Sequence, residues 1–259
     1  MPQVYPGKTG YGRPAFEVSA VHLNRVILLS EQYPTTDHYP FNLSVLQRTR
    51  ELTFSLPVTF LVGENGTGKS TLLEAVAHRC HIHIWRGTER KRFEVNPYEG
   101  DLYKCIDVEW TDGPVPGSYF ASEIFRYFAE SLDEWAAATP ELLTYFGGKS
   151  LVTQSHGQSL LSFFKARYQI EGLYLLDEPE TALSPKSQLE LLDLLRGAGS
   201  SGKAQFIIAT HSPILLACPQ STIHSFDHTP IQMIGYEDTD PYKIYKRFME
   251  NPSRYMAGG

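Results

Sequence analysis

The chain has 259 residues, 42% of them hydrophobic, which suits either one large folded domain or two small ones. Its 23 basic and 29 acidic side chains give a net charge of −6, which argues against broad, charge-driven nucleic-acid binding, although a local patch could still serve. No segment reaches the ~18–20 consecutive apolar residues of a membrane helix, so we expect no membrane insertion by this chain.

The N-terminus and the cysteines indicate a compartment. Residues 1–13 are polar and rich in glycine and proline, unlike a secretory signal. The three cysteines, Cys80, Cys105 and Cys218, are odd in number and widely spaced, as is typical of a reduced cytoplasm. We therefore expect a cytoplasmic protein.

Two apolar, strand-like runs come first, at 21–29 and 52–62, with a polar and aromatic loop at 31–42 between them. The loop contains Tyr39 and Phe41. Either aromatic ring could contact a ligand or pack the loop onto a sheet, and the sequence does not decide between these roles.

The second run leads into a complete phosphate-binding pattern, G-x-x-x-x-G-K-[ST]. The pattern comprises Gly63, Glu64, Asn65, Gly66, Thr67, Gly68, Lys69 and Ser70. Its glycines let backbone N–H groups turn inward toward phosphate oxygens. The Lys69 ammonium can reach the β- and γ-phosphates, and the Ser70 hydroxyl can ligate Mg²⁺. A buried strand at 57–62 and a helix at 71–77 flank the loop, as the motif requires.

Two clusters follow that helix, and each has a plain structural interpretation. His78, Cys80, His81 and His83 lack a two-plus-two zinc spacing, and no second cluster follows, so we interpret them as a helix end and the next strand. A basic group surrounds Trp85 and is interrupted by Glu89. It consists of Arg79, Arg86, Arg90, Lys91 and Arg92. We interpret this group as a solvated face, with nucleic-acid binding as the alternative.

Residues 81–150 are predicted to form an inserted lobe within one domain that spans 1–259. The lobe contains strand-like pieces over 81–110 and a helix over 121–138, with Ile124, Phe125, Phe128 and Leu132 on one face. Only 84 residues lie between Ser70 and Ser155 (155 − 70 − 1). Because a helix rises only ~1.5 Å per residue, there is no room for a long coiled-coil arm.

The segment 154–158 (Gln-Ser-His-Gly-Gln) is a polar turn before a helix, with Ser155 or Ser159 as its capping residue. The helix leads into an aliphatic strand at 173–176 that ends in Asp177 and Glu178. Ligands bind at the carboxyl ends of parallel strands. We therefore predict that Asp177 holds Mg²⁺, directly or through water, and that Glu178 polarises an attacking water.

A third strand, 206–209, ends near His211, 33 residues after Glu178 (211 − 178). The leucine-rich helix at 187–196 supplies the crossover, so the unit is βαβ and brings His211 to the same sheet edge. A neutral imidazole there could contact the γ-phosphate or the water. The tail over 223–259 carries one or two short helices at 242–256 around Pro252 and no chemical signature.

Four segments, in this order along the chain, resemble an ABC-type ATPase: the 63–70 loop, the 154–158 turn, the strand that ends in Asp177 and Glu178, and the strand that ends near His211. The family signature is Leu-Ser-Gly-Gly-Gln. Ser155, Gly157 and Gln158 match it, whereas Gln154 and His156 do not. Residues 181–184 resemble the dimer-contacting loop that follows the catalytic glutamate in the family, with a serine in place of the usual aspartate. The resemblance implies an α/β P-loop NTPase fold: an ABC-type nucleotide-binding domain with a mostly parallel central sheet and a short inserted helical lobe.

The resemblance also implies a site for ATP and Mg²⁺. Catalytic roles would fall to Glu178, His211 and Lys69, and Mg²⁺ would bind Ser70 and Asp177. The nucleotide would contact the whole loop from Gly63 to Ser70, together with Thr71, and, from a second protomer, Ser155, Gly157 and Gln158. Tyr39 or Phe41 would stack on adenine, and Glu123 could replace the family's Mg²⁺-sensing glutamine.

The implied function is ATP hydrolysis that drives an ATP-dependent homodimer switch. The whole chain most closely resembles compact bacterial predicted ATPases related to the DNA-repair and chromosome-maintenance branch, which favours DNA maintenance or defence, with DNA or another protein as partner. Alternatives are the nucleotide-binding subunit of a transporter with a separate membrane chain, and a nucleotide-sensing scaffold. The intact Glu178 argues against the scaffold.

Overall fold

The computed structural model describes residues 21–84, 96–146, 148, 150, 152 and 156–256, and a six-stranded sheet lies at its centre. The strand order is β5-β6-β7-β3-β8-β9. The strands are β3 (Val58–Val62), β5 (Gly117–Ala121), β6 (Gly172–Asp177), β7 (Ala204–Ala209), β8 (Ser221–Ser225) and β9 (Gln232–Met233). All neighbouring pairs are parallel except β8 and β9. The expected α/β class with a mostly parallel central sheet is confirmed.

A second, antiparallel sheet has three strands in the order β2-β1-β4. They are β1 (Leu23–Leu28), β2 (Glu51–Thr53) and β4 (Ile106–Trp110). The apolar run over 52–62 therefore divides between two sheets, with β2 in one and β3 in the other. Pro57 lies at the break, and its missing backbone N–H suits a position just before a strand.

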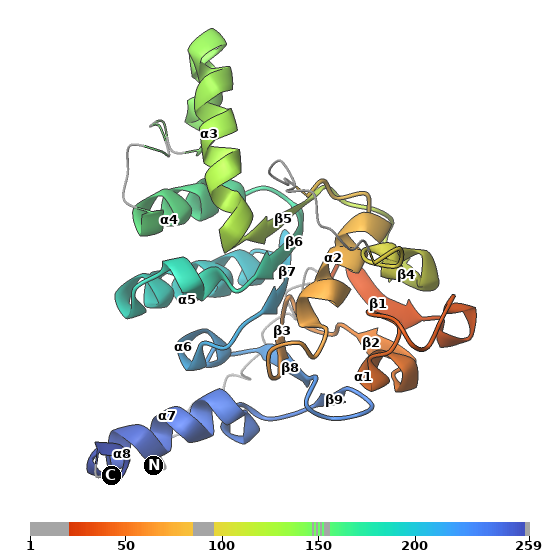
Figure 1. Cartoon of the computed structure of the whole chain (residues 1–259). Coiled ribbons are helices and arrows are strands. Elements are labelled where there is room, and N and C mark those ends of the chain that lie inside the picture. Colours follow the sequence, from red (N-terminus) through yellow and green to blue (C-terminus); the bar gives the residue numbers. More distant parts are fainter. Residues whose placement is uncertain are drawn as a thin grey trace, which may run out of the picture.

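The central strands are buried on both faces, which explains their continuous apolar sequences. Every residue of β3 and of β7 is buried. Phe60 points into the core that faces α4 (His156–Arg167), α5 (Pro185–Ser200) and α6 (Pro213–Leu216), and Leu61 points into the core on the other side. There α2 (Lys69–Arg79) and the smaller sheet cover the central sheet, so the molecule is layered (Figure 1).

Within 81–150, the chain contributes to both sheets before it forms helices. Strand β4 pairs with β1, and β5 pairs with β6. Only then does α3 (Ser122–Ala138) extend away from the body, followed by η3 (Pro140–Phe146) (Figure 1). The expected apolar face of α3 is buried at Phe125 and Leu132, and Phe125 contacts Phe163 of α4 with ring centroids 5.7 Å apart.

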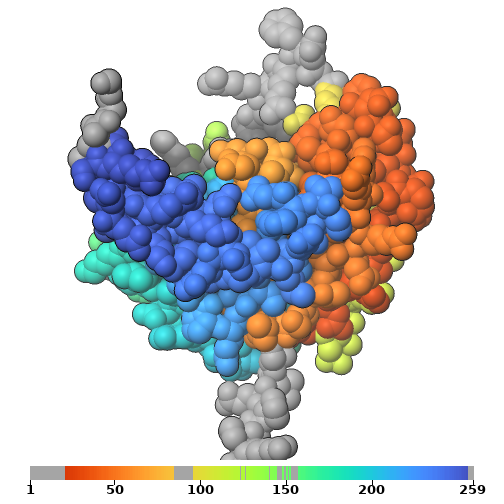
Figure 2. All heavy atoms as spheres, turned by 90° about the horizontal axis from the view of Figure 1, so that it is seen from below, coloured from red at the N-terminus to blue at the C-terminus, as the bar shows by residue number. Residues whose placement is uncertain are grey.

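The C-terminal part packs beside the N-terminal part on the face seen in Figure 2. The Ile231 N–H donates to Thr49 Oγ1 at 2.9 Å. The two helices expected around Pro252 are α7 (Asp240–Glu250) and α8 (Ser253–Met256). The remaining elements are η1 (Ser30–Gln32), α1 (Ser44–Arg48), η2 (Asp101–Cys105), η4 (Pro179–Ala182) and η5 (Tyr236–Asp238). Across the described ranges, no helix has the length and apolar character needed to span a bilayer.

Candidate active site

The loop over 63–70 joins the end of β3 to the start of α2, as the strand–loop–helix pattern predicted. Gly63, Gly66 and Gly68 have φ angles of +146°, +80° and +99°, in a backbone region that residues other than glycine rarely adopt. A Cβ on Gly68 would also lie 2.8 Å from Leu43 Cδ1. The first N–H groups of α2 have no partner within the helix, so they can donate to an anion.

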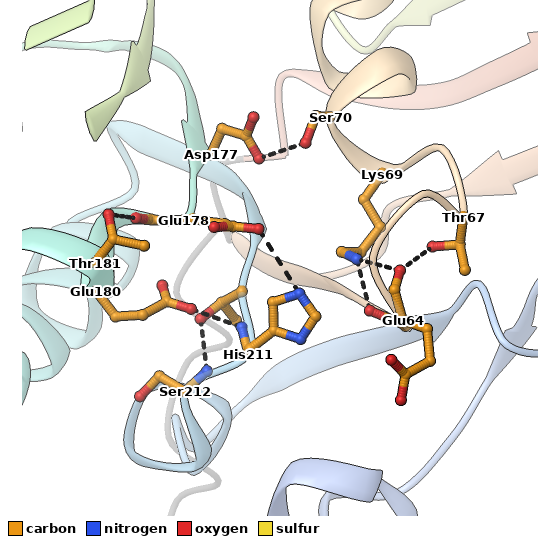
Figure 3. A network of polar contacts seen from close by, with 12 residues as sticks. Glu64, Thr67, Lys69, Ser70, Asp177, Glu178, Glu180, Thr181, His211 and Ser212 are labelled. Carbon is orange, nitrogen blue, oxygen red and sulfur yellow. Dashed lines mark hydrogen bonds and ion pairs between the residues drawn. The ribbon is translucent and has the colours of Figure 1, made fainter. Parts of the chain in front are cut away.

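Lys69 is the buried cation of this loop. Its Nζ donates to the carbonyl oxygens of Gly63 at 2.6 Å and Glu64 at 2.9 Å, which closes the loop on itself (Figure 3). Burial lowers the pKa of Lys69, and nearby carboxylates, Glu178 first among them, act in the opposite direction. The ammonium therefore lies within the loop, at the start of α2.

Asp227 fixes the phosphate loop from outside it, and our sequence analysis missed this residue. The Glu64 N–H donates to Asp227 Oδ1 at 2.8 Å. Asp227 lies two residues beyond β8, which runs parallel to β3. The available signal was the one used for His211, a polar residue just beyond a buried strand, but the sequence does not show that β8 is the neighbour of β3.

Asp177 lies at the end of β6 and contacts two hydroxyl groups. The Ser70 hydroxyl donates to Asp177 Oδ1 at 3.0 Å, and the Tyr119 hydroxyl donates to Oδ2 at 3.3 Å. Burial is the main reason that the pKa of Asp177 rises to about 6; both hydrogen bonds oppose the rise, and Glu178 adds to it. A carboxylate and a hydroxyl that already touch are oxygen ligands of the kind that Mg²⁺ prefers, so these residues fit that ion. Tyr119 also escaped the sequence analysis.

Glu178 has a left-handed backbone conformation, with φ +44° and ψ +55°, which is uncommon for a residue other than glycine. Several hydrogen bonds hold it there. Its N–H donates to the Ala209 carbonyl of β7 at 2.9 Å, and its carbonyl accepts from the Ser122 hydroxyl at 3.1 Å and the Thr181 hydroxyl at 3.0 Å. The turn re-aims the side chain immediately after the strand, as such local strain often does at functional sites.

His211 and Glu178 face each other across the ends of β7 and β6. His211 Nε2 lies 3.7 Å from Glu178 Oε1, as Figure 3 shows. Nε2 is buried and has no hydrogen-bond partner among the described residues. The His211 N–H donates to Glu180 Oε1 at 2.6 Å. The structure thus brings Lys69, Ser70, Asp177, Glu178 and His211 to one edge of the sheet.

The signature-like segment is only partly described. Gln154 and Ser155 lie outside the described residues, and α4 begins at His156. A Cβ on Gly157 would lie 3.3 Å from the Ala182 carbonyl oxygen, so the start of α4 packs closely on the loop after Glu178. Ser159 is wrong as the alternative cap, because it is buried within α4. Gln158 is exposed.

The two aromatic residues of the 31–42 loop differ in exposure. Phe41 is fully buried and packs on Tyr33, with ring centroids 4.8 Å apart. Tyr39 is 39% exposed, and its hydroxyl contacts the Thr71 hydroxyl at the start of α2. Tyr39 also lines a cavity of about 210 Å³ together with Ser70 and Thr71. Of the two, only Tyr39 is accessible to a ligand next to the phosphate loop.

Other candidates from the sequence lie apart from this edge or outside the described ranges. Trp85, Arg86, Arg90, Lys91 and Arg92 are outside them, as is the side chain of Glu123. The remaining basic residue, Arg79, pairs with Asp107 at 2.9 Å on the surface. His78 and Arg79 form the last turn of α2, as expected, but residues 81–84, which we expected to begin the next strand, form no strand. The described residues contain no group of three or more metal-binding side chains.

Comparisons with known proteins find ATPase domains and ATP-binding proteins. A family described as "AAA domain, putative AbiEii toxin, Type IV TA system" matches residues 158–217, and a second AAA-domain family matches 41–78. The thiamine import ATP-binding protein ThiQ of Ruegeria sp. is 26% identical over 174 residues, covering 59% of this chain and 70% of that protein.

Among solved structures, cbiO1 of Clostridium perfringens, part of an ABC transporter complex, aligns over 90% of this chain and 98% of its own, with a TM-score of 0.50 and 16% identity. The SMC head domain of Thermotoga maritima aligns over 83% and 99%, with a TM-score of 0.45 and 17% identity. The family matches, the sequence relative, the shared fold and the phosphate loop together support an ABC-type P-loop ATPase.

Proposed function

We propose that this chain hydrolyses ATP with Mg²⁺ at the edge where β3, β6 and β7 end. The observation that carries the proposal is the convergence of five side chains at or beyond the carboxyl ends of three adjacent strands. They are Lys69, Ser70, Asp177, Glu178 and His211. A cation, a hydroxyl–carboxylate pair, a candidate base and an imidazole are what phosphoryl transfer to water needs around a γ-phosphate. The whole chain would act as one ATPase domain, from which α3 projects.

Each residue has a distinct task in this proposal. Lys69 would exchange its contacts with the Gly63 and Glu64 carbonyls for contacts with the β- and γ-phosphates. Ser70 and Asp177 would hold Mg²⁺, which neutralises phosphate charge. Glu178 would accept a hydrogen bond from the attacking water and orient it, and His211, 3.7 Å away, would contact that water or the γ-phosphate.

The second half of the site would come from another copy of this chain. Residues 155–158 would contact the nucleotide of the partner, with Ser155 supplying a hydroxyl and Gly157 a backbone N–H. The packing of Gly157 on the Ala182 carbonyl supports this proposal, because it links the signature segment to the loop after Glu178. ATP would then hold two copies together, and hydrolysis would release them.

The test is a dimer trap. Glu178→Gln keeps the shape of the side chain but loses the charge that orients water, so it should bind ATP, lose most hydrolysis and accumulate a dimer in light scattering with ATP and Mg²⁺. Lys69→Ala should not bind ATP tightly. Glu190→Gln, at an exposed carboxylate on α5 that pairs with Lys165, is the matched control and should behave as wild type.

Two results would contradict the shared site. A Glu178→Gln protein that stays monomeric at saturating ATP would be one. The other is a Ser155→Arg,Glu178→Gln double variant that still forms the dimer, because a bulky cation should block that interface. Unchanged hydrolysis in a folded Lys69→Ala protein would overturn the catalytic assignment itself.

The process served by hydrolysis follows from the partner. We propose a stand-alone ATPase in DNA maintenance or defence, and the family match to a toxin–antitoxin ATPase domain supports the defence arm. The similarity to a thiamine import ATP-binding protein favours a second candidate, the nucleotide-binding subunit of a transporter. A pull-down with ATP-trapped Glu178→Gln separates the two, since a membrane chain among the captured partners would favour the transporter subunit.

A further inference from the structure

Glu180 is a third carboxylate at this edge of the sheet, and the proposed reaction assigns it no task. It lies in η4, two residues beyond Glu178, and points toward the loop that follows β7 (Figure 3). Its Oε1 accepts the His211 N–H at 2.6 Å, whereas its Oε2 is buried without a hydrogen-bond partner among the described residues. A buried carboxylate that satisfies only one of its oxygens is costly, so its place here requires a reason.

The backbone around Glu180 explains how its carboxyl reaches His211. The left-handed turn at Glu178 reverses the chain after β6, and Pro179 begins the η4 helix. The Thr181 hydroxyl closes the turn by donating to the Glu178 carbonyl at 3.0 Å. Glu180 is therefore held between two fixed points, the turn that aims Glu178 and the loop that carries His211.

A second polar link joins the same two segments. The Ser212 hydroxyl donates to Gln188 Oε1 at 2.6 Å, and Gln188 Nε2 donates to the Leu183 carbonyl at 3.1 Å. Gln188 is in the first turns of α5, which Ser184 caps by accepting the Ser187 N–H at 3.2 Å. Residues 180–188 thus hold the backbone of His211 and the hydroxyl of Ser212.

We propose that Glu180 is a positioning residue: it fixes the main chain of His211 so that the imidazole faces Glu178. Through the same contact, Glu180 links the imidazole to the 181–184 loop. This inference rests on the proposed hydrolysis. Glu180 contacts neither the phosphate loop nor the Ser70–Asp177 pair in the described hydrogen bonds, so it acts through His211. The hydrogen bond from the His211 N–H to Glu180 Oε1 is short, at 2.6 Å, and any side chain that keeps an acceptor oxygen at this position can fix the main chain of His211.

The test compares variants that differ in the ability to accept the His211 N–H. Glu180→Met keeps the length of the side chain but removes the acceptor, and should lower kcat for ATP about 10- to 100-fold with KM within about threefold of wild type. Glu180→Gln keeps an acceptor oxygen and should remain within about threefold of wild type in kcat. A structural role alone would not produce this rescue together with an unchanged KM.

A double-mutant cycle shows whether Glu180 acts through His211. The variant Glu180→Met,His211→Ala should be no slower than His211→Ala alone, because the imidazole that Glu180 positions is absent. Should Glu180→Met fail to fold, Gln188→Leu removes the second link and should give a smaller loss of kcat that also disappears in the His211→Ala background.

Several outcomes would overturn the inference. Losses that multiply in the double variant would show that Glu180 acts independently of His211. A Glu180→Gln protein as slow as Glu180→Met would mean that charge, not acceptance, matters. Wild-type hydrolysis that depends on Glu178 but not on Glu180 would overturn this inference and leave the proposed function intact, whereas an absence of wild-type hydrolysis would overturn both.

Discussion

Asp177→Asn should stabilise the nucleotide-free protein while impairing its Mg²⁺-dependent reaction. The carboxylate is partly buried, and this burial raises its pKa from 3.8 to about 6. At ~1.36 kcal/mol per pKa unit, ionised Asp177 therefore disfavours the folded state by ~3 kcal/mol at pH above 7. Asparagine keeps an acceptor for the Ser70 hydroxyl and a polar group beside Tyr119, but carries no charge. We expect the free energy of unfolding to rise by about 1–3 kcal/mol, with the lower values applying where the amide forms weaker hydrogen bonds with its neighbours than the carboxylate does.

The sign of the pH dependence makes this prediction specific. Because the folded-state pKa is raised, the wild-type protein loses stability as pH rises from about 4 through about 6, and Asp177→Asn does not. Urea denaturation without nucleotide should thus show the full difference at pH 7.5 and a difference under ~1 kcal/mol at pH 4. Protonation of the same carboxyl should weaken Mg²⁺ binding about tenfold for each pH unit below about 6 in the wild type.

Asp193→Asn is the matched control. Asp193 is on α5 with its side chain 70% exposed and pairs with Arg196 one turn away, so its substitution should change stability by less than ~0.5 kcal/mol at either pH. An Asp177→Asn protein that is less stable than wild type at pH 7.5 would refute the reasoning. A stability gain of the same size at pH 4 and pH 7.5 would also refute it, because the effect would then not come from ionisation.

Two further predictions concern nucleotide affinity. Tyr39→Ala should raise the KM for ATP about tenfold, because it removes a ring that can stack on the base, while Tyr39→Phe keeps the ring and the affinity. Phe41→Ala should instead lower the free energy of unfolding by ~3–5 kcal/mol and leave the KM little changed, because Phe41 is buried. The reverse pattern would exchange the roles of the two residues. Asp227→Ala should raise the KM for ATP about fivefold, because the Glu64 N–H loses its acceptor, whereas Asp227→Asn keeps an acceptor and should bind ATP at least as tightly as wild type. Equal KM values for the wild type and both variants would show that Asp227 does not support the phosphate loop.

The elements that the sequence predicted best are those whose pattern is local. Continuous apolar runs predicted β3, β6 and β7. The spacing of the glycines predicted the 63–70 loop, whose positive φ angles glycine readily adopts. The sequence also predicted that Lys69 and Asp177 lie close together, because the carboxyl ends of parallel strands meet at the same edge of a sheet.

What the sequence could not predict depends on which strands are neighbours. Tyr119 reaches Asp177 because β5 lies beside β6, a pairing made by segments 58 positions apart. For the same reason, residues 106–121 looked like part of a separate lobe although they complete the two sheets. Glu180 was visible beside Glu178, but its contact depends on a turn whose φ of +44° no local preference of glutamate would suggest.

The hydrogen bond from Glu64 to Asp227 spans 163 positions, which has a consequence for synthesis. A chain emerging from the ribosome completes the 63–70 motif long before β8, which pairs with β3, and Asp227, which accepts the Glu64 N–H, have emerged. A fragment that ends at 217, where the family match stops, would contain every motif residue and lack both supports. We expect such fragments, released and assayed with a fluorescent ATP analogue, to gain tight nucleotide binding only once their length passes 227. Competence to bind ATP would then appear only after translation has passed Asp227.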